Sequence, residues 1–231
     1  ASPVVDAIPF DLTAAGYALC IVDTGGNHAD LTPDYAAVPA EMKAVANALG
    51  GDVQFEVLDA DDQGDGELGV NAYNDLLDDG VNIMLSTVTS GSCMAVADVA
   101  YEERVFMLTP SGSADAITEG KDNIYRVCFK DSAQGAASAQ YIAENGLPTK
   151  VGVIYNNGDA SSTGIAQGFI NQCSALGLEV VTEQTFPADT NTDFNVQLTA
   201  CKDGGAELVF MPIYYPPASL VLTQADAMGY D

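Results

Sequence analysis

The polarity pattern alternates between short apolar runs and longer segments in which apolar residues return every three or four positions. The short runs predict buried strands and the longer segments predict helices. Strands are predicted at residues 17–22, 53–59, 81–85, 105–108, 124–129, 151–155, 179–185 and 208–211. Helical segments are predicted at residues 39–49, 67–79, 92–103, 114–119, 134–145, 162–176, 194–203 and 217–228.

This order of elements predicts the fold class. Strands that alternate with helices of this length indicate parallel sheets with helices on both faces, as in α/β proteins. Right-handed crossovers place the carboxyl ends of the strands along one edge of each sheet. We therefore expect an α/β fold in which the loops that follow the strands lie side by side.

Two of these loops are rich in hydroxyl groups and glycine. Residues 89–92 read TSGS and residues 109–113 read TPSGS, and each cluster follows an apolar strand-like run. Between the two clusters lies a helix-like segment. Loops of this kind can present backbone N–H groups, carbonyls and hydroxyls to one small ligand. The pattern predicts a binding site for a small polar molecule.

Composition narrows the classes of function. The chain has 231 residues, 48% of them hydrophobic, which is enough for one large domain or two small ones. It carries 33 acidic and 7 basic residues, a formal net charge of −26. Nucleic acids and anionic membranes both require basic patches, so neither is an expected partner. The excess of acid is explained by a well-solvated surface or, alternatively, by adaptation to high salt.

The sequence gives less information about export and about the pairing of the cysteines. No apolar run is long enough to span a membrane, and no signal peptide is visible, so any export signal is expected to have been removed or never present. The five cysteines are unevenly spaced and form no CxxC, which predicts neither a disulfide framework nor a zinc site. One bridging pair remains possible outside the cell.

Several motifs suggest chemistry that their surroundings exclude. Residues 64–69 read GxGxxG, but neighbouring acidic side chains are hostile to pyrophosphate and no acid ends the next strand. Residues 59–65 suggest calcium, yet Val70 stands where an EF-hand needs its bidentate acid. His28 is the only histidine, and no P-loop occurs. We expect no catalytic residues, no cofactor and no metal.

From about residue 53 to 231 the chain resembles the substrate-binding proteins of branched-chain amino-acid ABC transporters. The resemblance lies in segments such as DVQFEVLDADDQGD, STVTSGSCMAVADVA, FMLTPSGSADAIT, YRVCFKDSAQGAASAQYI and QADAMGYD. It implies the type I periplasmic-binding fold: two Rossmann-like lobes that close on a ligand. The first lobe would be residues 1–129, with 53–129 as its binding-protein part, and the second residues 130–231. The family's return strands are missing after residue 231, so the second lobe is expected to be C-terminally truncated.

Residues 1–50 resemble something different. PFDLTAAGYALCIVDTGGNHADLTPDYAAVPAEMKAVANALG is similar to an internal segment of bacterial galactokinases, although that family's N-terminal signature, ATP loop and catalytic-aspartate motif are absent. We therefore expect a chimera or fused fragment. Residues 1–52 would supply the first strand, loop and helix, with the strand at 17–22 beside the strand at 53–59.

The resemblance implies site residues in the first lobe. Thr89 and Ser90, at the start of a helix, would hold the ligand carboxylate; ordinary N-capping is the alternative. Ser111 and Ser113 match positions that offer a backbone carbonyl and a hydroxyl to the ligand ammonium; a proline-initiated turn is the alternative. The family's acidic group for the ammonium lies beyond residue 231.

The resemblance also implies site residues in the second lobe. Tyr214 or Tyr215 would cover the ligand, unless the two form a packed aromatic pair beside the prolines. Ser161 and Ser162 stand where the family often has an aromatic side chain, so the resemblance does not fix the size of the ligand. Ser161 is expected to be a ligand-binding residue.

Together these observations predict an extracytoplasmic solute-binding protein, periplasmic or lipid-anchored at the cell surface, that is not an enzyme. It would bind an amino acid, branched-chain or similar, and deliver it to an ABC transporter permease by hinge closure. Two alternatives stay open: a galactokinase-related sugar kinase fragment, and a folded chimeric fragment with no ligand.

Overall fold

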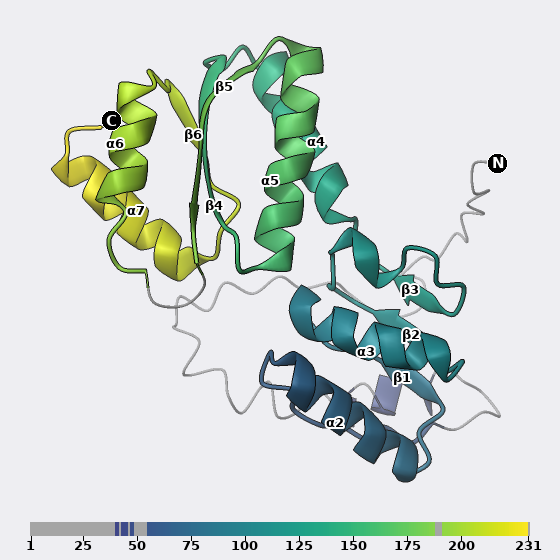
Figure 1. The fold of residues 1–231 in the computed structure, drawn as a ribbon. Helices are drawn as coiled ribbons and strands as arrows, with labels where there is room; N and C mark the ends of the chain where they lie inside the picture. Colours follow the sequence, from purple (N-terminus) through teal and green to yellow (C-terminus); the bar gives the residue numbers. More distant parts are fainter. Residues whose placement is uncertain (1–39, 42, 46, 49–54, 188–190, 231) are drawn as a thin grey trace. The chain divides into compact units, whose positions relative to one another are not determined.

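The computed structural model describes residues 40–41, 43–45, 47–48, 55–187 and 191–230 (Figure 1). Its chain divides into two compact units, Ala1–Leu58 and Asp59–Asp231. In the first unit the described residues between 40 and 48 are helical, and the side chain of Asn47 hydrogen-bonds the backbone N–H and carbonyl of Phe55. The strand predicted at residues 17–22 lies outside the described residues.

The strand predicted at residues 53–59 is wrong over the part that the structure describes. Residues 55–59 have no strand conformation. A strand needs a hydrogen-bonded neighbour, and within the described residues β1 pairs only with β2. The expected pairing of this segment with residues 17–22 stays untested, because its partner is outside the described part.

The second unit contains a first sheet of three parallel strands in the order β1-β2-β3. These are β1 (Ile83–Leu85), β2 (Phe106–Thr109) and β3 (Ile124–Arg126). Helix α2 (Gly66–Asp78) packs on α3 (Ser90–Glu102), and a 3-10 turn, η2 (Asp115–Ile117), precedes β3. This 3-10 turn confirms the short helical turn that the sequence predicts at residues 114–119.

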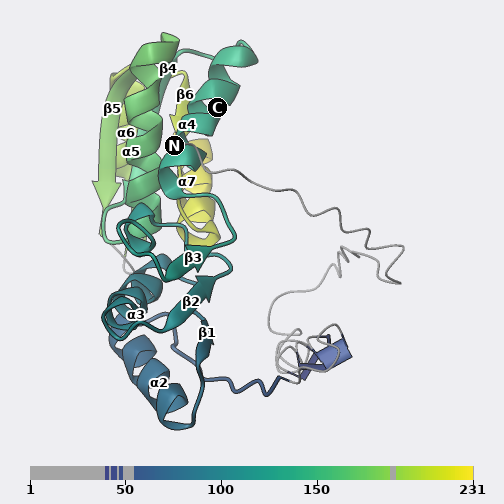
Figure 2. The same ribbon diagram turned by 90° about the vertical axis from the view of Figure 1, so that its right-hand side faces the viewer.

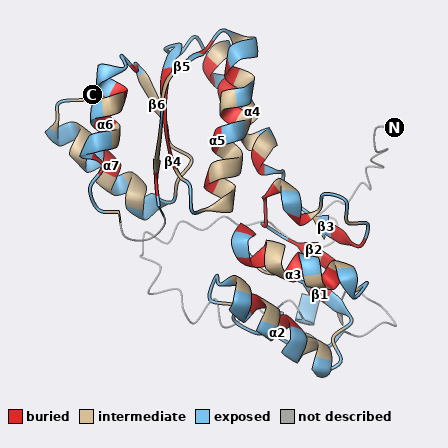
Figure 3. Ribbon diagram, in the orientation of Figure 1, coloured by how far each residue is buried: buried red, intermediate tan, exposed pale blue. Residues whose placement is uncertain are grey.

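The first sheet buries one face against α3. Met84, Met107 and Ile124, one from each strand, form a core with Val96 and Ala97 of the helix. Alternate strand residues point the other way, as the pleat requires. Ile83, Leu85, Phe106 and Tyr125 are exposed, and Figure 3 colours the buried residues of β2 and α3 red.

A second parallel sheet has the order β5-β4-β6, with β4 (Lys150–Asn156) between β5 (Glu179–Phe186) and β6 (Leu208–Phe210). Helices α4 (Asp131–Glu144) and α5 (Ala160–Cys173) cover one face, followed by the turn η3 (Ser174–Leu176). Helices α6 (Asn195–Asp203) and α7 (Tyr215–Ala227) cover the other face, as Figure 1 shows, and Figure 2 views the sheet from the side of α4 and α5. Neighbouring residues of β4 serve opposite cores: Val153 packs toward α4 and α5, and Ile154 toward α6 and α7.

Glycines let α4 and α5 approach closely. A Cβ added to Gly168 would lie 2.7 Å from the Cα of Ser132, and one added to Gly135 would overlap the carbonyl of Ile165. A Cβ on Gly164 would lie 2.8 Å from the Cβ of Asp131. Because these glycines have no side chains, the backbones of α4 and α5 can lie in close contact.

The structure confirms the α/β class with parallel sheets flanked by helices. The expected lobe boundary between residues 129 and 130 stays a prediction. Cys93, Cys128, Cys173 and Cys201 are free thiols, whereas Cys20 lies outside the described residues. Among the described residues, no helix combines the length and apolar character that crossing a membrane requires.

Candidate functional site

The first group of predicted residues surrounds the start of α3. Thr89 is the N-cap residue, in an extended conformation, but its side chain makes no capping hydrogen bond. Its buried Oγ1 has no partner in the described part of the protein. The first intrahelical bond runs from the N–H of Cys93 to the carbonyl of Thr89. The earlier N–H groups of the helix therefore remain at its positive end without the cap that a threonine usually supplies.

Ser90 holds two loops together. Its side chain is buried, and its Oγ accepts hydrogen bonds from the backbone N–H groups of Ser113 and Ala114, each at 3.2 Å. This fixes the loop after β2 beside the first turn of α3. The two hydroxyl clusters that the sequence analysis singled out are thus in direct contact, through side chain and backbone.

Ser111 and Ser113 differ in their surroundings. Ser111 is exposed, and its hydroxyl donates to the carbonyl of Val88 at 3.0 Å. Ser113 is 9% exposed, and its Oγ lies 3.1 Å from the Oγ of Ser161. Arg126 fixes the same loop, because its Nη1 donates to the carbonyls of Ser113 and Ala114 at 2.7 and 2.9 Å. Ser161 thus contacts the hydroxyl of Ser113, and Arg126 fixes its backbone carbonyl.

Asp131 is a residue of this site that the sequence analysis missed. It is the first residue of α4 and is completely buried. Its Oδ1 accepts a 2.8 Å hydrogen bond from the hydroxyl of Ser161, and its backbone N–H donates to the carbonyl of Ser113 at 3.0 Å. Burial raises the pKa of Asp131, against the lowering effect of the Ser113 and Ser161 hydroxyls. The available signal was an acid at the first position of a predicted helix, which normally indicates only a favourable interaction with the helix dipole.

A second acid near this point is paired. Asp115 accepts hydrogen bonds from the hydroxyl and the backbone N–H of Ser132, at 2.8 and 3.1 Å, and lies 3.2 Å from Nζ of Lys130. Burial alone would raise the pKa of Asp115, but the bonds from Ser132 and the charge of Lys130 outweigh it and lower that pKa. Asp115 is therefore paired with a cation, whereas in the part of the chain that the structure describes no cation pairs with Asp131.

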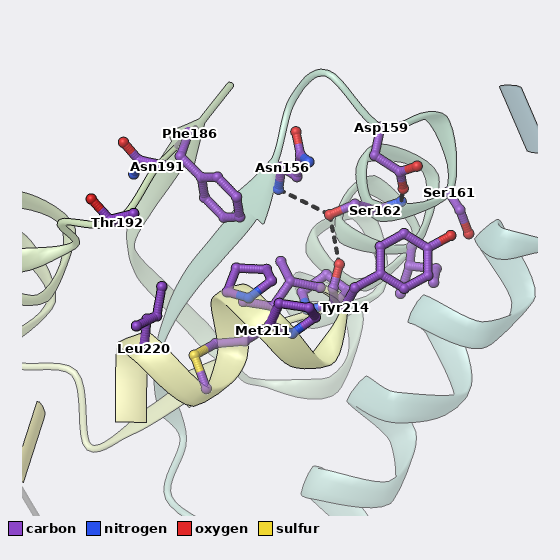
Figure 4. Close-up of a pocket in the computed structure, with 15 residues that line it drawn as sticks. Asn156, Asp159, Ser161, Ser162, Phe186, Asn191, Thr192, Met211, Tyr214 and Leu220 are labelled. Carbon is purple, nitrogen blue, oxygen red and sulfur yellow. Dashed lines mark hydrogen bonds between the residues drawn. The ribbon is translucent and has the colours of Figure 1, made fainter. Parts of the chain in front are cut away.

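A cavity of about 590 Å³ lies where the strands of the second sheet end (Figure 4). Its polar side includes Asn156, Asp159 and Ser161. The loop geometry is fixed by Ser162, whose Oγ accepts from the N–H of Asn156 at 2.9 Å and donates to the carbonyl of Pro212 at 2.6 Å. Apolar side chains make up much of the remaining lining: Ile165, Phe186, Met211, Ile213, Leu220 and three prolines.

The structure separates the two candidate tyrosines. Tyr214 lines the cavity and is 58% exposed, while Tyr215 begins α7, is 77% exposed and is absent from the lining. Figure 4 shows the hydroxyl of Tyr214 directed toward the side of the cavity where Ser161 lies. Burial first, and then the charges of Asp159 and Asp131, raise the pKa of Tyr214. Of the pair, Tyr214 has the position that a covering residue would need.

Five of the predicted residues therefore form one connected region. Thr89, Ser90 and Ser113 meet at the start of α3, and Ser113 meets Ser161, which borders the cavity with Tyr214. Thr89, Ser90, Ser111 and Ser113 are not part of the cavity lining itself. Tyr215 is outside the region. Hydroxyls, carbonyls and a free helix N-terminus can recognise both charges of a small zwitterion, and among the described residues no cluster of His, Cys, Asp and Glu fits a metal ion.

Comparison with known families gives one match over most of the chain. The family described as "Periplasmic binding protein" matches residues 20–231. The match includes residues 20–52, most of the segment in which the sequence resembles galactokinases. The comparisons do not show that resemblance, nor a chimeric origin.

The similar curated proteins are binding proteins. A Leu/Ile/Val-binding protein homologue of Brucella melitensis is 33% identical over 74% of this chain and 46% of its own length. The Leu/Ile/Val-binding protein BraC3 of Rhizobium johnstonii is 32% identical over 80% of this chain and 49% of its own. The chain spans about half the length of these relatives.

Solved structures share the fold. A leucine-binding protein of Thermotoga maritima superposes with a TM-score of 0.76 at 26% identity, covering 88% of this chain and 58% of that one. A branched-chain amino-acid transporter substrate-binding protein of Streptococcus pneumoniae, solved with isoleucine, gives 0.74 at 28% identity over 89% of this chain and 59% of that one.

Proposed function

The chain belongs to the periplasmic binding protein family, and from this premise we propose that it is an extracytoplasmic solute-binding protein for an amino acid with an apolar, branched side chain. It acts by binding and not by catalysis. The observation that carries the proposal is the 3.1 Å contact between Ser113 and Ser161. It joins hydroxyl-rich loops of the first sheet to the rim of the cavity in the second.

The proposed ligand is held by its two charges. Its carboxylate lies at the N-terminus of α3, where N–H groups lack the cap that Thr89 would ordinarily give them and where the helix dipole favours an anion. Its ammonium lies at the backbone carbonyl of Ser111 and the hydroxyl oxygen of Ser113, both of which can accept a hydrogen bond. Arg126 donates a hydrogen bond to the carbonyl of Ser113 and so fixes the position of that loop.

The second sheet supplies the environment for the side chain. The apolar part of the cavity suits an aliphatic group, and its volume of about 590 Å³ is ample for one amino acid. Tyr214 covers the ligand with its ring, and its hydroxyl is directed toward the side of the cavity where Ser161 lies. The relatives named for leucine, isoleucine and valine support this choice of side chain.

Binding draws the two sheets with their helices together, and the closed form is delivered to the permease of an ABC transporter. In this scheme the protein works in the periplasm or lipid-anchored at the cell surface. The contact between Ser113 and Ser161 forms part of the surface on which closure occurs.

Calorimetric titration with the twenty standard amino acids tests the proposal. We expect affinity for leucine, isoleucine or valine, and a loss of about 10–100-fold in the Ser113→Ala variant, because a hydrogen bond to a charged group contributes about 1.5–3 kcal/mol. Ser174→Ala, an exposed serine at the far end of α5, is the matched control and should bind normally. A folded protein that binds none of the twenty would contradict the proposal.

A further inference from the structure

Asp131 occupies an unusual place in this site, because it is buried, pairs with no cation among the described residues and contacts two residues of the proposed ligand site. We propose that Asp131 is a positioning residue: through Ser161 it orients the hydroxyl of Ser113 so that Ser113 offers only an acceptor to the ligand. This inference rests on the proposed function and adds to it the reason why the site selects a ligand with a donating, positively charged amino group.

The hydroxyl of Ser161 lies within hydrogen-bond distance of both Asp131 and Ser113. A serine hydroxyl has one proton to donate. The Oγ of Ser161 lies 2.8 Å from Oδ1 of Asp131, and Oδ1 is also approached by the side-chain amide of Gln134 at 3.4 Å. An oxygen that receives two donors is an acceptor, so the proton of Ser161 is directed at Asp131. The Oγ of Ser161 then has only lone pairs left.

The donor in the contact between Ser161 and Ser113 is then Ser113. Its Oγ is 3.1 Å from that of Ser161, and since Ser161 has already committed its proton, Ser113 must be the donor in this contact. A bond from Ser113 straight to the carboxylate of Asp131 would use the same proton in the same inward direction. In either arrangement the side of the Ser113 oxygen that remains for a ligand carries lone pairs alone.

The direction of these bonds follows from the ionised form of Asp131, because a carboxylate has no proton and its oxygens can only accept. Its second oxygen, Oδ2, is buried, faces Gly164 and has no hydrogen-bond partner among the described residues. The other titratable groups around Asp131 are Asp115 and Asp159, whose charges raise its pKa, and Tyr214. Lys130, the nearby cation, is bound to Asp115 instead.

The chemical consequence is selectivity at one end of the ligand. An ammonium group donates to Ser113 and gains a charge-assisted hydrogen bond, whereas a carboxylate or carbonyl would meet lone pairs only. A methylene in the place of the amino group would leave a desolvated acceptor without a partner, which proteins tolerate poorly. The arrangement therefore favours amines over otherwise identical acids.

The test compares two probes, L-leucine and 4-methyl-2-oxopentanoate, which has a carbonyl oxygen, a hydrogen-bond acceptor, in place of the amino group. The readout is the ratio of their dissociation constants. We expect a ratio of at least about 100 in the wild type. In Ser161→Ala the hydroxyl of Ser113 is free to turn outward and donate, so the ratio falls at least tenfold, mainly because 4-methyl-2-oxopentanoate, whose carbonyl can accept that hydrogen bond, binds better. Ser161→Thr restores the hydroxyl and the ratio, and Ser174→Ala does not change it.

Asp131→Ala should lower the ratio as Ser161→Ala does, and the double variant should lower it no further. Independent effects that multiply in the double variant would overturn the proposal, as would an unchanged ratio in either single variant. A second measurement is made without ligand and keeps the Asp131 side chain intact. The carboxyl ¹³C shift of Asp131 should titrate at higher pH in Ser161→Ala than in Ser174→Ala, because the carboxylate has lost a donor.

The two readouts separate the two claims. A wild type that binds no leucine contradicts the proposed function, and the titration then decides the inference about Asp131 by itself. An Asp131 carboxyl group that titrates identically in Ser161→Ala and wild type would overturn it, because Ser161 would not then donate to Asp131.

Discussion

The hydroxyl oxygens of Ser113 and Ser161 lie 3.1 Å apart although 48 residues separate them in the chain. One follows a strand of the first sheet, and the other lies in the first turn of a helix on the second sheet. Two features hold them: the backbone N–H of Asp131 binds the carbonyl of Ser113, and the Asp131 carboxyl group accepts from Ser161. The contact therefore joins the polar groups of the loop after β2 to those at the start of α5.

The two adjacent tyrosines give a paired test of the cavity. Tyr214→Ala should weaken amino-acid binding by about tenfold, which corresponds to the loss of roughly 55 Å² of buried apolar area at about 25 cal/mol per Å². Tyr215→Ala should have little effect, since Tyr215 does not line the cavity. Calorimetry on both variants measures this. Equal losses in the two would show that Tyr214 has no special position.

The close packing of α4 on α5 predicts a sharp stability effect at Gly168. Gly168→Ala places a methyl group against the backbone of Ser132 and should destabilise the protein by about 1–3 kcal/mol. At about 2–4 °C for each kcal/mol, the melting temperature falls accordingly. Gly91→Ala is the control, because nothing lies within 4 Å of its added Cβ. If the two variants melted together, the helices would not be packed as described.

The raised pKa of Asp131 predicts a dependence of stability on pH. Its folded-state pKa is raised above the unfolded value of about 3.9, so the folded state retains a proton that the unfolded state has released. That contribution is complete below pH 4 and is lost as the pH rises through the folded pKa. Asp131→Asn cannot ionise, and the urea midpoint of the variant minus that of wild type should therefore increase from pH 4 to pH 7.

Asp115 changes stability in the opposite sense. Its lowered pKa contributes stability above the unfolded value that is lost as the pH falls. It is present in both wild type and Asp131→Asn, so the difference between these two proteins isolates Asp131. A difference that stayed flat or decreased toward pH 7 would mean that burial of Asp131 does not disfavour its ionised form.

The net charge of −26 predicts that salt stabilises the protein. Added NaCl screens repulsion among the carboxylates, so melting should occur at higher temperature in 1 M than in 0.05 M NaCl. A gain of about 2 kcal/mol would appear as a rise of about 4–8 °C. Tetramethylammonium chloride at equal ionic strength should act similarly. Melting that is insensitive to both salts would favour a surface whose charges are already well separated.

The sequence predicted the class of fold because period and spacing report local conformation. The strand–helix order of the second unit followed from apolar runs such as residues 151–155, which became the buried centre of β4. Residues 55–59 are apolar in part but form no strand, because a strand depends on a partner that spacing cannot identify.

The candidate site was only partly predictable. Hydroxyls at strand ends and helix starts are visible in a sequence, and Ser90, Ser113 and Ser161 indeed lie close together. The role of Asp131 was hidden, because burial and the hydrogen bond from Ser161 arise from the packing of α4 against α5. Sequence also could not choose between Tyr214 and Tyr215, which differ only in the direction set by the start of α7.

The proposed site recognises both charged groups of a free amino acid. Calorimetric titration of the wild-type chain with L-leucine, leucinamide and 4-methylpentanoate measures what each charged group contributes, since each analogue lacks one charge. We predict that both analogues bind at least about 100-fold more weakly than leucine, because each leaves a polar end of the site without its partner. Binding of either analogue as tightly as leucine would contradict the account.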